Sequence, residues 1–223
     1  MGMLQSYCQP CKISSVEKDM QKRIVYKRPS RSSSDDKART SPSTNTCPHF
    51  TMSYDHKELL QKHYRQTLLE QRPDVFHKTM LMCIQSSPKL NEIIACQMYC
   101  FRDLTKWPKL NRLSQAQCYF FDRLIHELHL DSFAVSEAVY QLGIIHFRYA
   151  QYGLKPHFLD LWRQHLEGFL EKLKFENSDE KAAFIEAFRV LTSYVTESMN
   201  LAYSRCQQEA AARAKEQPAP PAD

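Results

Sequence analysis

His146 stands four residues after Leu142, near the end of an apolar segment with helical spacing. Residues four apart share one face of a helix, so both side chains can point into one apolar cavity. A neutral imidazole is a good axial ligand for haem iron, and an apolar wall limits the access of solvent to the metal. The alternative is a core histidine bonded to a backbone carbonyl, which is the more common role of an isolated histidine.

Cys8 and Cys11 form the one C-x-x-C pair among the eight cysteines. No second pair and no downstream His-x-x-x-His pattern completes a zinc site, so zinc binding is not favoured. The remaining cysteines are scattered, which is typical of free thiols in a reducing compartment.

The first six residues fit the myristoylation pattern, with Gly2 as acceptor and Ser6 four residues later. Stable anchoring needs a second signal, which palmitate on Cys8 or Cys11 would supply. The basic run 18–31 would add contacts with anionic lipid. The alternative is that so short a pattern arises by chance. We expect attachment to the inner leaflet, on the cytoplasmic face of the plasma membrane.

The formal net charge of +5 is concentrated in one short segment. Residues 12–39 hold nine Lys or Arg against four Asp or Glu, so the rest of the chain is close to neutral and no nucleic-acid partner is expected. No segment approaches the roughly 20 apolar residues that span a bilayer, and the N-terminus lacks the apolar core of a secretory signal.

The composition predicts one helical domain between two extensions. Residues 1–50 are basic and poor in apolar groups, which predicts a disordered extension, and residues 213–223 predict a disordered tail. Across 51–212 the apolar residues recur at helical spacing between proline or polar breaks. The segments with an apolar face are 59–68, 76–84, 90–94, 108–128, 132–146, 156–170 and 177–199.

The stretch Leu-Gly-Ile-Ile-His at 142–146, followed by Gly-Leu-Lys-Pro-His-Phe at 153–158, resembles the end of the proximal helix of globins and the start of the next helix. The resemblance covers about residues 53–210 and is closest to the diverse globins of nematodes. It implies an all-α globin fold of about eight helices, haem b as cofactor, and His146 as the proximal ligand.

The resemblance also suggests the distal side of a haem pocket. Ile94 stands where the family has a phenylalanine stacked on the haem, and Met80 falls at a distal-pocket position. Residues 107–125 resemble the distal helix of nerve-type globins. In that register Leu113 replaces the usual distal histidine and Gln117 lies one turn later, over the iron. Other registers place Gln115 or Ala116 there, and none places a histidine.

These features predict a haem-binding globin that binds oxygen or another diatomic ligand, with a role in redox signalling or electron transfer at the membrane surface and a reductase as partner. An enzyme is the less favoured interpretation. The alternative is a haem-free helical adaptor built on a globin frame, which the missing distal histidine and Ile94 would permit. His126 and His129, farther along the distal segment, are expected to be solvated.

Overall fold

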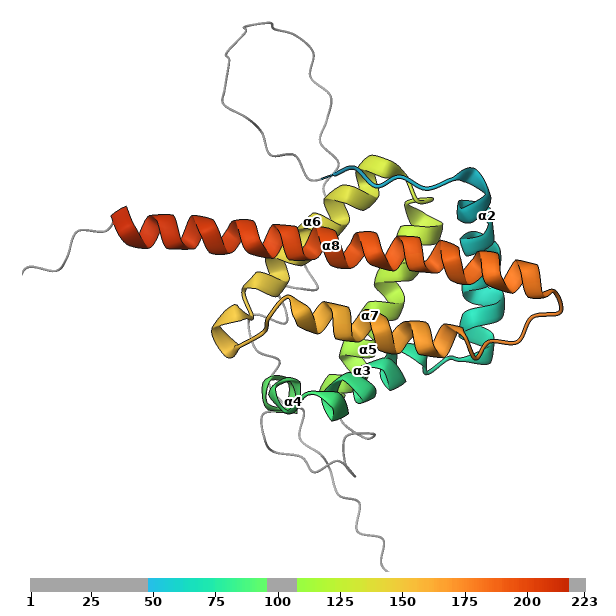
Figure 1. The fold of residues 1–223 in the computed structure, drawn as a ribbon, viewed down its shortest axis with the longest axis horizontal. Helices are drawn as coiled ribbons and strands as arrows, with labels where there is room; N and C mark the ends of the chain where they lie inside the picture. Colours follow the sequence, from blue (N-terminus) through green and yellow to red (C-terminus); the bar gives the residue numbers. More distant parts are fainter. Residues whose placement is uncertain (1–47, 96–107, 217–223) are drawn as a thin grey trace, which may run out of the picture. The chain divides into compact units, whose positions relative to one another are not determined.

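The computed structural model describes residues 48–95 and 108–216, which belong to the compact unit 45–223. All regular structure in these residues is helical, so the predicted all-α class is confirmed (Figure 1). The helices in chain order are α2 (Tyr54–His63), α3 (Val75–Ser86), α4 (Pro88–Ala95), α5 (Pro108–Asp122), α6 (Ser132–Phe147), α7 (His157–Leu170) and α8 (Ser178–Glu216).

Local capping interactions explain where several helices begin. The Ser53 hydroxyl accepts from a backbone N–H in the first turn of α2, and the Asp131 carboxylate does the same for α6. The Asn177 side chain accepts from the Asp179 N–H at 2.8 Å at the start of α8. Short polar side chains at these positions satisfy N–H groups that have no partner within the helix. Pro88 and Pro108 are the first residues of α4 and α5, where a missing N–H costs nothing.

Two helices continue into wider π-helical turns, at Tyr64–Leu69 after α2 and at Arg123–Glu127 after α5. The sequence pattern predicts continuous helices here and contains no sign of these turns. The guanidinium of Arg65 donates two hydrogen bonds to the carboxylate of Asp122, at 2.6 and 2.7 Å, and so ties the two regions together.

The helices pack in defined pairs. α8 lies against α6, α2 and α7, while α3 lies against α5 and α7 (Figure 1). Gly143 marks the contact of α6 with α8, because a Cβ there would lie 2.6 Å from the Cβ of Ala202.

The buried apolar side chains form two clusters. The larger cluster joins α2, α3, α5, α6, α7 and α8, and its centre contains Phe121 and Phe188. The smaller cluster, called here the α3–α4 cluster, has the buried residues Met80, Cys83, Ile84, Leu90, Ile94, Leu110 and Phe158. Trp162 of α7 packs against both clusters and therefore connects them.

The predicted lipidation residues Gly2, Cys8 and Cys11 lie outside the described residues. Among the residues that are described, no helix has the length and apolar character needed to cross a membrane.

Candidate functional site

His146 occupies the last turn of α6 and is held by its own helix. Its Nδ1 lies 2.9 Å from the carbonyl oxygen of Leu142, one turn earlier. A carbonyl only accepts, so Nδ1 carries the proton and Nε2 keeps the lone pair of the neutral ring. Across residues 48–95 and 108–216, Nε2 has no hydrogen-bond partner.

Burial keeps His146 in the form that binds metals. The apolar surroundings lower the pKa of His146, and the bond to the Leu142 carbonyl offsets only part of that effect. The ring is therefore neutral at neutral pH. Histidines that bind metals commonly donate their other ring N–H to a carbonyl in this manner.

The wall beside His146 is closely packed. A cavity of about 10 Å³ adjoins the ring, which leaves room for one water molecule at most. The Tyr203 hydroxyl of α8 donates to the Leu154 carbonyl at 2.7 Å and fixes the turn before α7. Gly153 in that turn has φ +91°, a conformation that favours glycine. The cavity is lined by His146, Leu154, Lys155, Pro156, Leu159, Met199, Asn200 and Tyr203.

The structure brings three of the predicted pocket residues together. Met80 and Ile94 are buried in the α3–α4 cluster, and Leu113 packs on it as a partly buried side chain. Leu154, which lines the cavity beside His146, packs on the same cluster. Leu142 packs instead against the larger cluster. These apolar side chains pack on one another, and the only space beside His146 among the described residues is the cavity of about 10 Å³.

Gln117 is a partly buried polar residue of α5, one turn after Leu113. Its Oε1 accepts a hydrogen bond from the indole Nε1 of Trp162 at 3.0 Å. The residues of the other registers, Gln115 and Ala116, are exposed. Sequence reasoning missed the role of Trp162, because its partner lies 45 positions away on a different helix.

The expectation that His126 is solvated is wrong. Its Nε2 contacts the carbonyl oxygen of Gln61 at 3.2 Å, and its side chain is only 20% exposed. His126 belongs to the π-helical turn Arg123–Glu127, and its ring lies against α2. His129 is exposed, as expected.

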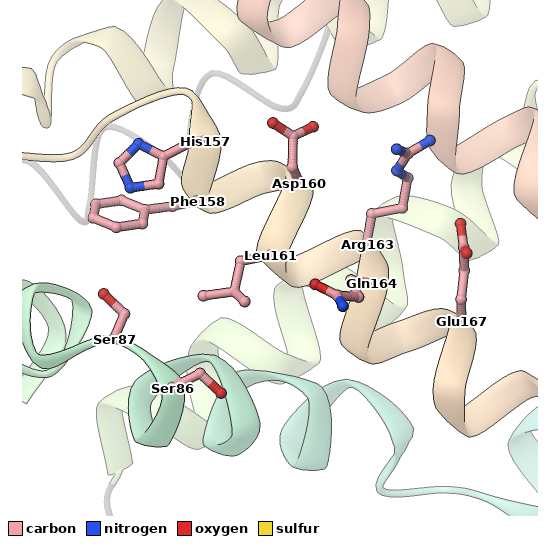
Figure 2. A pocket seen from close by; sticks show the side chains of 9 residues that line it. All are labelled: Ser86, Ser87, His157, Phe158, Asp160, Leu161, Arg163, Gln164 and Glu167. Atoms are coloured by element: carbon pink, nitrogen blue, oxygen red, sulfur yellow. The ribbon is translucent and has the colours of Figure 1, made fainter.

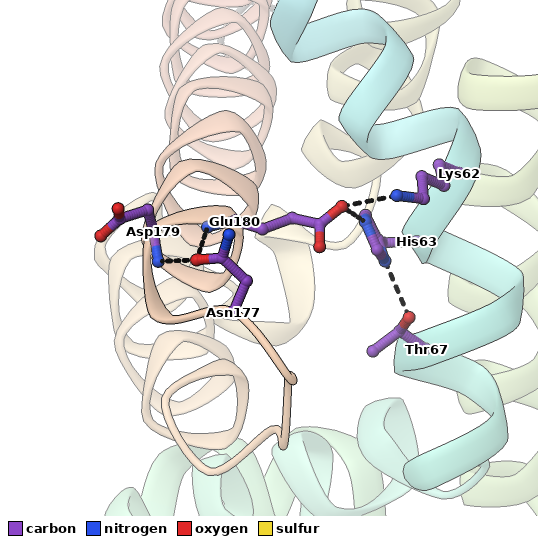
Figure 3. A network of polar contacts seen from close by, with 6 residues as sticks. All are labelled: Lys62, His63, Thr67, Asn177, Asp179 and Glu180. Atoms are coloured by element: carbon purple, nitrogen blue, oxygen red, sulfur yellow. Dashed lines mark hydrogen bonds and ion pairs between the residues drawn. The ribbon is translucent and has the colours of Figure 1, made fainter.

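A second histidine, His63, connects α2 to α8 (Figure 3). Its Nδ1 lies 2.8 Å from the Thr67 hydroxyl and its Nε2 lies 2.9 Å from a carboxylate oxygen of Glu180. The bond from Lys62, followed by that from His63, lowers the pKa of Glu180. Asn177 therefore caps the start of α8, whereas the Glu180 side chain three residues later turns to α2 and completes no capping box with it.

An open groove of about 630 Å³ runs between the end of α3 and α7 (Figure 2). At its edge the Ser86 hydroxyl lies 3.0 Å from Nε2 of His165, and Arg163 donates to Ser193 of α8. In the described part of the chain no carboxylate orients the other nitrogen of His165, so this pair lacks the third member of a nucleophilic triad. The hydrogen bond between Ser86 and His165 links α3 to α7.

No group of three His, Cys, Asp or Glu side chains that could hold a metal ion exists among the described residues. An iron porphyrin needs a single protein ligand, which His146 could supply. The cavity of about 10 Å³ beside the ring, however, is far smaller than the roughly 300–1,000 Å³ of pockets that hold ligands of such size, so the site as it stands has no room for a porphyrin. Comparisons with protein-family models, curated proteins and solved structures find no match for this chain.

Proposed function

We propose that this chain is a haem-binding globin in which His146 binds the iron. The observation that carries the proposal is the state of the His146 ring. Nδ1 donates to the Leu142 carbonyl, the pKa is lowered by burial, and the Nε2 lone pair is unused within the described residues. Metal-bound histidines have this arrangement, because the carbonyl orients the ring and raises its basicity.

The packing of the helices supports the globin assignment. A globin packs its helices pairwise around a haem pocket. In the proposed assignment α5 is the distal helix and α6 the proximal helix, and in the described residues α5 packs mainly on α3 whereas α6 packs mainly on α8. The apolar residues Met80, Ile94 and Leu113 lie together beside them.

The proposed activity is reversible binding of oxygen or another diatomic ligand, with redox signalling or electron transfer at the membrane surface. Haem supplies an iron that binds the ligand. His146 would hold the cofactor, the α3–α4 cluster would exclude water, and the Gln117 amide would be the candidate donor to the ligand. Attachment through Gly2, Cys8 and Cys11 remains a proposal that rests on the sequence pattern.

The test compares reduced-minus-oxidised spectra of wild type, His146→Ala and a matched control, His129→Ala, after titration with haem. His129 is exposed, so its loss should leave the spectrum unchanged. His146→Ala should lose most haem while its far-ultraviolet circular dichroism stays helical. Equal haem retention and identical spectra in all three proteins would refute the assignment of His146.

The second candidate is a haem-free helical adaptor, and one observation favours it. The interior is closely packed without a cofactor, because Trp162 bonds to Gln117 and packs against both clusters, and the cavity beside His146 is only about 10 Å³. The same haem titration distinguishes the two candidate functions, because wild-type protein that is an adaptor would give no stoichiometric haem spectrum.

A further inference from the structure

We propose that the small cavity at the end of α6 is a binding site for a single water molecule, which donates one hydrogen bond to His146 and one to Asn200 of α8. The inference goes beyond the proposed haem function and does not depend on it. Three observations carry it: two acceptor groups on residues that line one cavity, the volume of that cavity, and the close approach of the two helices beside it.

The two polar groups concerned are both hydrogen-bond acceptors. Nδ1 of His146 donates to the Leu142 carbonyl at 2.9 Å, so Nε2 carries only a lone pair while the ring is neutral. Burial lowers the pKa of His146 and favours that neutral form. The side-chain oxygen of Asn200 is buried and has no hydrogen-bond partner within the described residues. Two acceptors cannot bond to each other, so a molecule that bonds to both must donate two hydrogens.

The cavity that both residues line fits a water molecule. Its volume of about 10 Å³ is at the lower limit of the roughly 10–15 Å³ that one water needs. The Tyr203 hydroxyl also lines it, but its hydrogen is donated to the Leu154 carbonyl at 2.7 Å. Ammonium is a donor of similar size, but Lys155 lines the same cavity and would repel a second cation. The cavity therefore selects a small neutral molecule with two hydrogens to donate, which is water.

The packing of α6 on α8 places the two acceptors on either side of the cavity. Gly143 is one turn before His146, and a Cβ there would lie 2.9 Å from the carbonyl oxygen of Met199, the neighbour of Asn200. Buried polar groups in folded proteins are nearly always bonded to protein or to ordered water, because an unpaired one is costly. The water therefore joins the last turn of α6 to α8 beside their close contact.

The first experiment observes the His146 ring by NMR in haem-free protein with ¹⁵N-labelled histidine, and His146→Phe identifies its signals. The ring should carry its proton on Nδ1, and its Hε1 proton should show an Overhauser effect to a water of long residence time. Asn200→Leu removes the second acceptor at similar volume. It should abolish this effect and move the Nε2 signal downfield, toward that of a free lone pair. Asn111→Leu, the same change at an exposed position of α5, should alter neither signal.

The second experiment counts long-lived waters by oxygen-17 magnetic relaxation dispersion, with circular dichroism to check that each variant is helical. Asn200→Leu and His146→Phe should each lose one water relative to wild type. The double variant should also lose one water and no more, because both acceptors hold the same molecule. Asn111→Leu should lose none.

The outcomes test the water bridge separately from the proposed function. A wild-type protein without the water signal overturns the bridge, whether or not the variants fold. An Nε2 signal that moves in Asn200→Leu, with no long-lived water in wild type, also overturns it, because the Asn200 amide would then donate directly to the ring. Loss of two waters in the double variant would show two separate molecules and refute a shared one. The haem titration can succeed or fail independently of all three results.

Discussion

Gly143→Ala tests the closest approach between two helices of this protein. A Cβ at this position would lie 2.6 Å from the Cβ of Ala202, 2.9 Å from the carbonyl oxygen of Met199 and 3.0 Å from its Cα. Ordinary contacts begin at 3.4 Å, and two of these three atoms belong to the backbone of α8. The helices α6 and α8 must therefore separate, since a change of rotamer cannot relieve the overlap.

The magnitude follows from two opposing effects. Overpacking of this kind costs about 1–3 kcal/mol, and replacement of a helical glycine by alanine returns about 0.5–1 kcal/mol. We expect a net loss of about 1–2 kcal/mol in the free energy of unfolding, or a melting temperature lower by about 2–8 °C for a domain of this size. Urea titration followed by circular dichroism measures the first quantity and thermal denaturation the second.

Gly168→Ala is the matched control, because a Cβ at Gly168 of α7 would meet nothing within 4 Å. It should stabilise the protein by about 0.5–1 kcal/mol. Combining Gly143→Ala with Ala202→Gly removes the nearest atom and should cost less than the sum of the two single changes. A Gly143→Ala protein as stable as wild type would show that α6 and α8 are not in close contact at Gly143.

Three further predictions concern other regions. Gly2→Ala should release the protein from membranes to the cytosol with an unchanged haem spectrum, and identical fractionation of variant and wild type would leave the myristoylation pattern without a role. Burial raises the pKa of Cys83 to about 12, so iodoacetamide at pH 8 should label it only after unfolding, while the more accessible Cys206 reacts first; equal rates by mass spectrometry would contradict this. Arg65 lowers the pKa of Asp122, so the ion pair stabilises the fold above the unfolded pKa and this contribution disappears as the pH falls through the folded pKa. Asp122→Asn should therefore be less stable than wild type at pH 7 and equally stable in acid, and a constant difference across the pH range would refute the assignment.

The sequence by itself determined where most of the helices lie and which helix face holds the candidate ligand His146. Capping residues such as Ser53 and Asp131 and the prolines Pro88 and Pro108 act within one turn, so their effect is readable from neighbouring residues alone. The spacing of Leu142 and His146 likewise predicted a shared face, and the structure adds the bond from the ring to the Leu142 carbonyl within the same turn. One helix boundary differs from the prediction. The sequence pattern starts this helix at residue 156, whereas α7 begins at His157 and Pro156 is its N-cap.

Only the tertiary structure decided which distant side chains meet. Gln117 and Trp162 are 45 positions apart, and Glu180 reaches His63 across 117 positions. Helical periodicity states which face a residue occupies, but not which helix covers that face or how near it comes. That depends on the packing of all the helices at once, with Gly143 allowing α8 to approach α6 closely. The hydrogen-bond partners of His126, Glu180 and Gln117 lie on other helices, so they depend on how the helices pack. They cannot be predicted from the helical pattern of each residue's own segment.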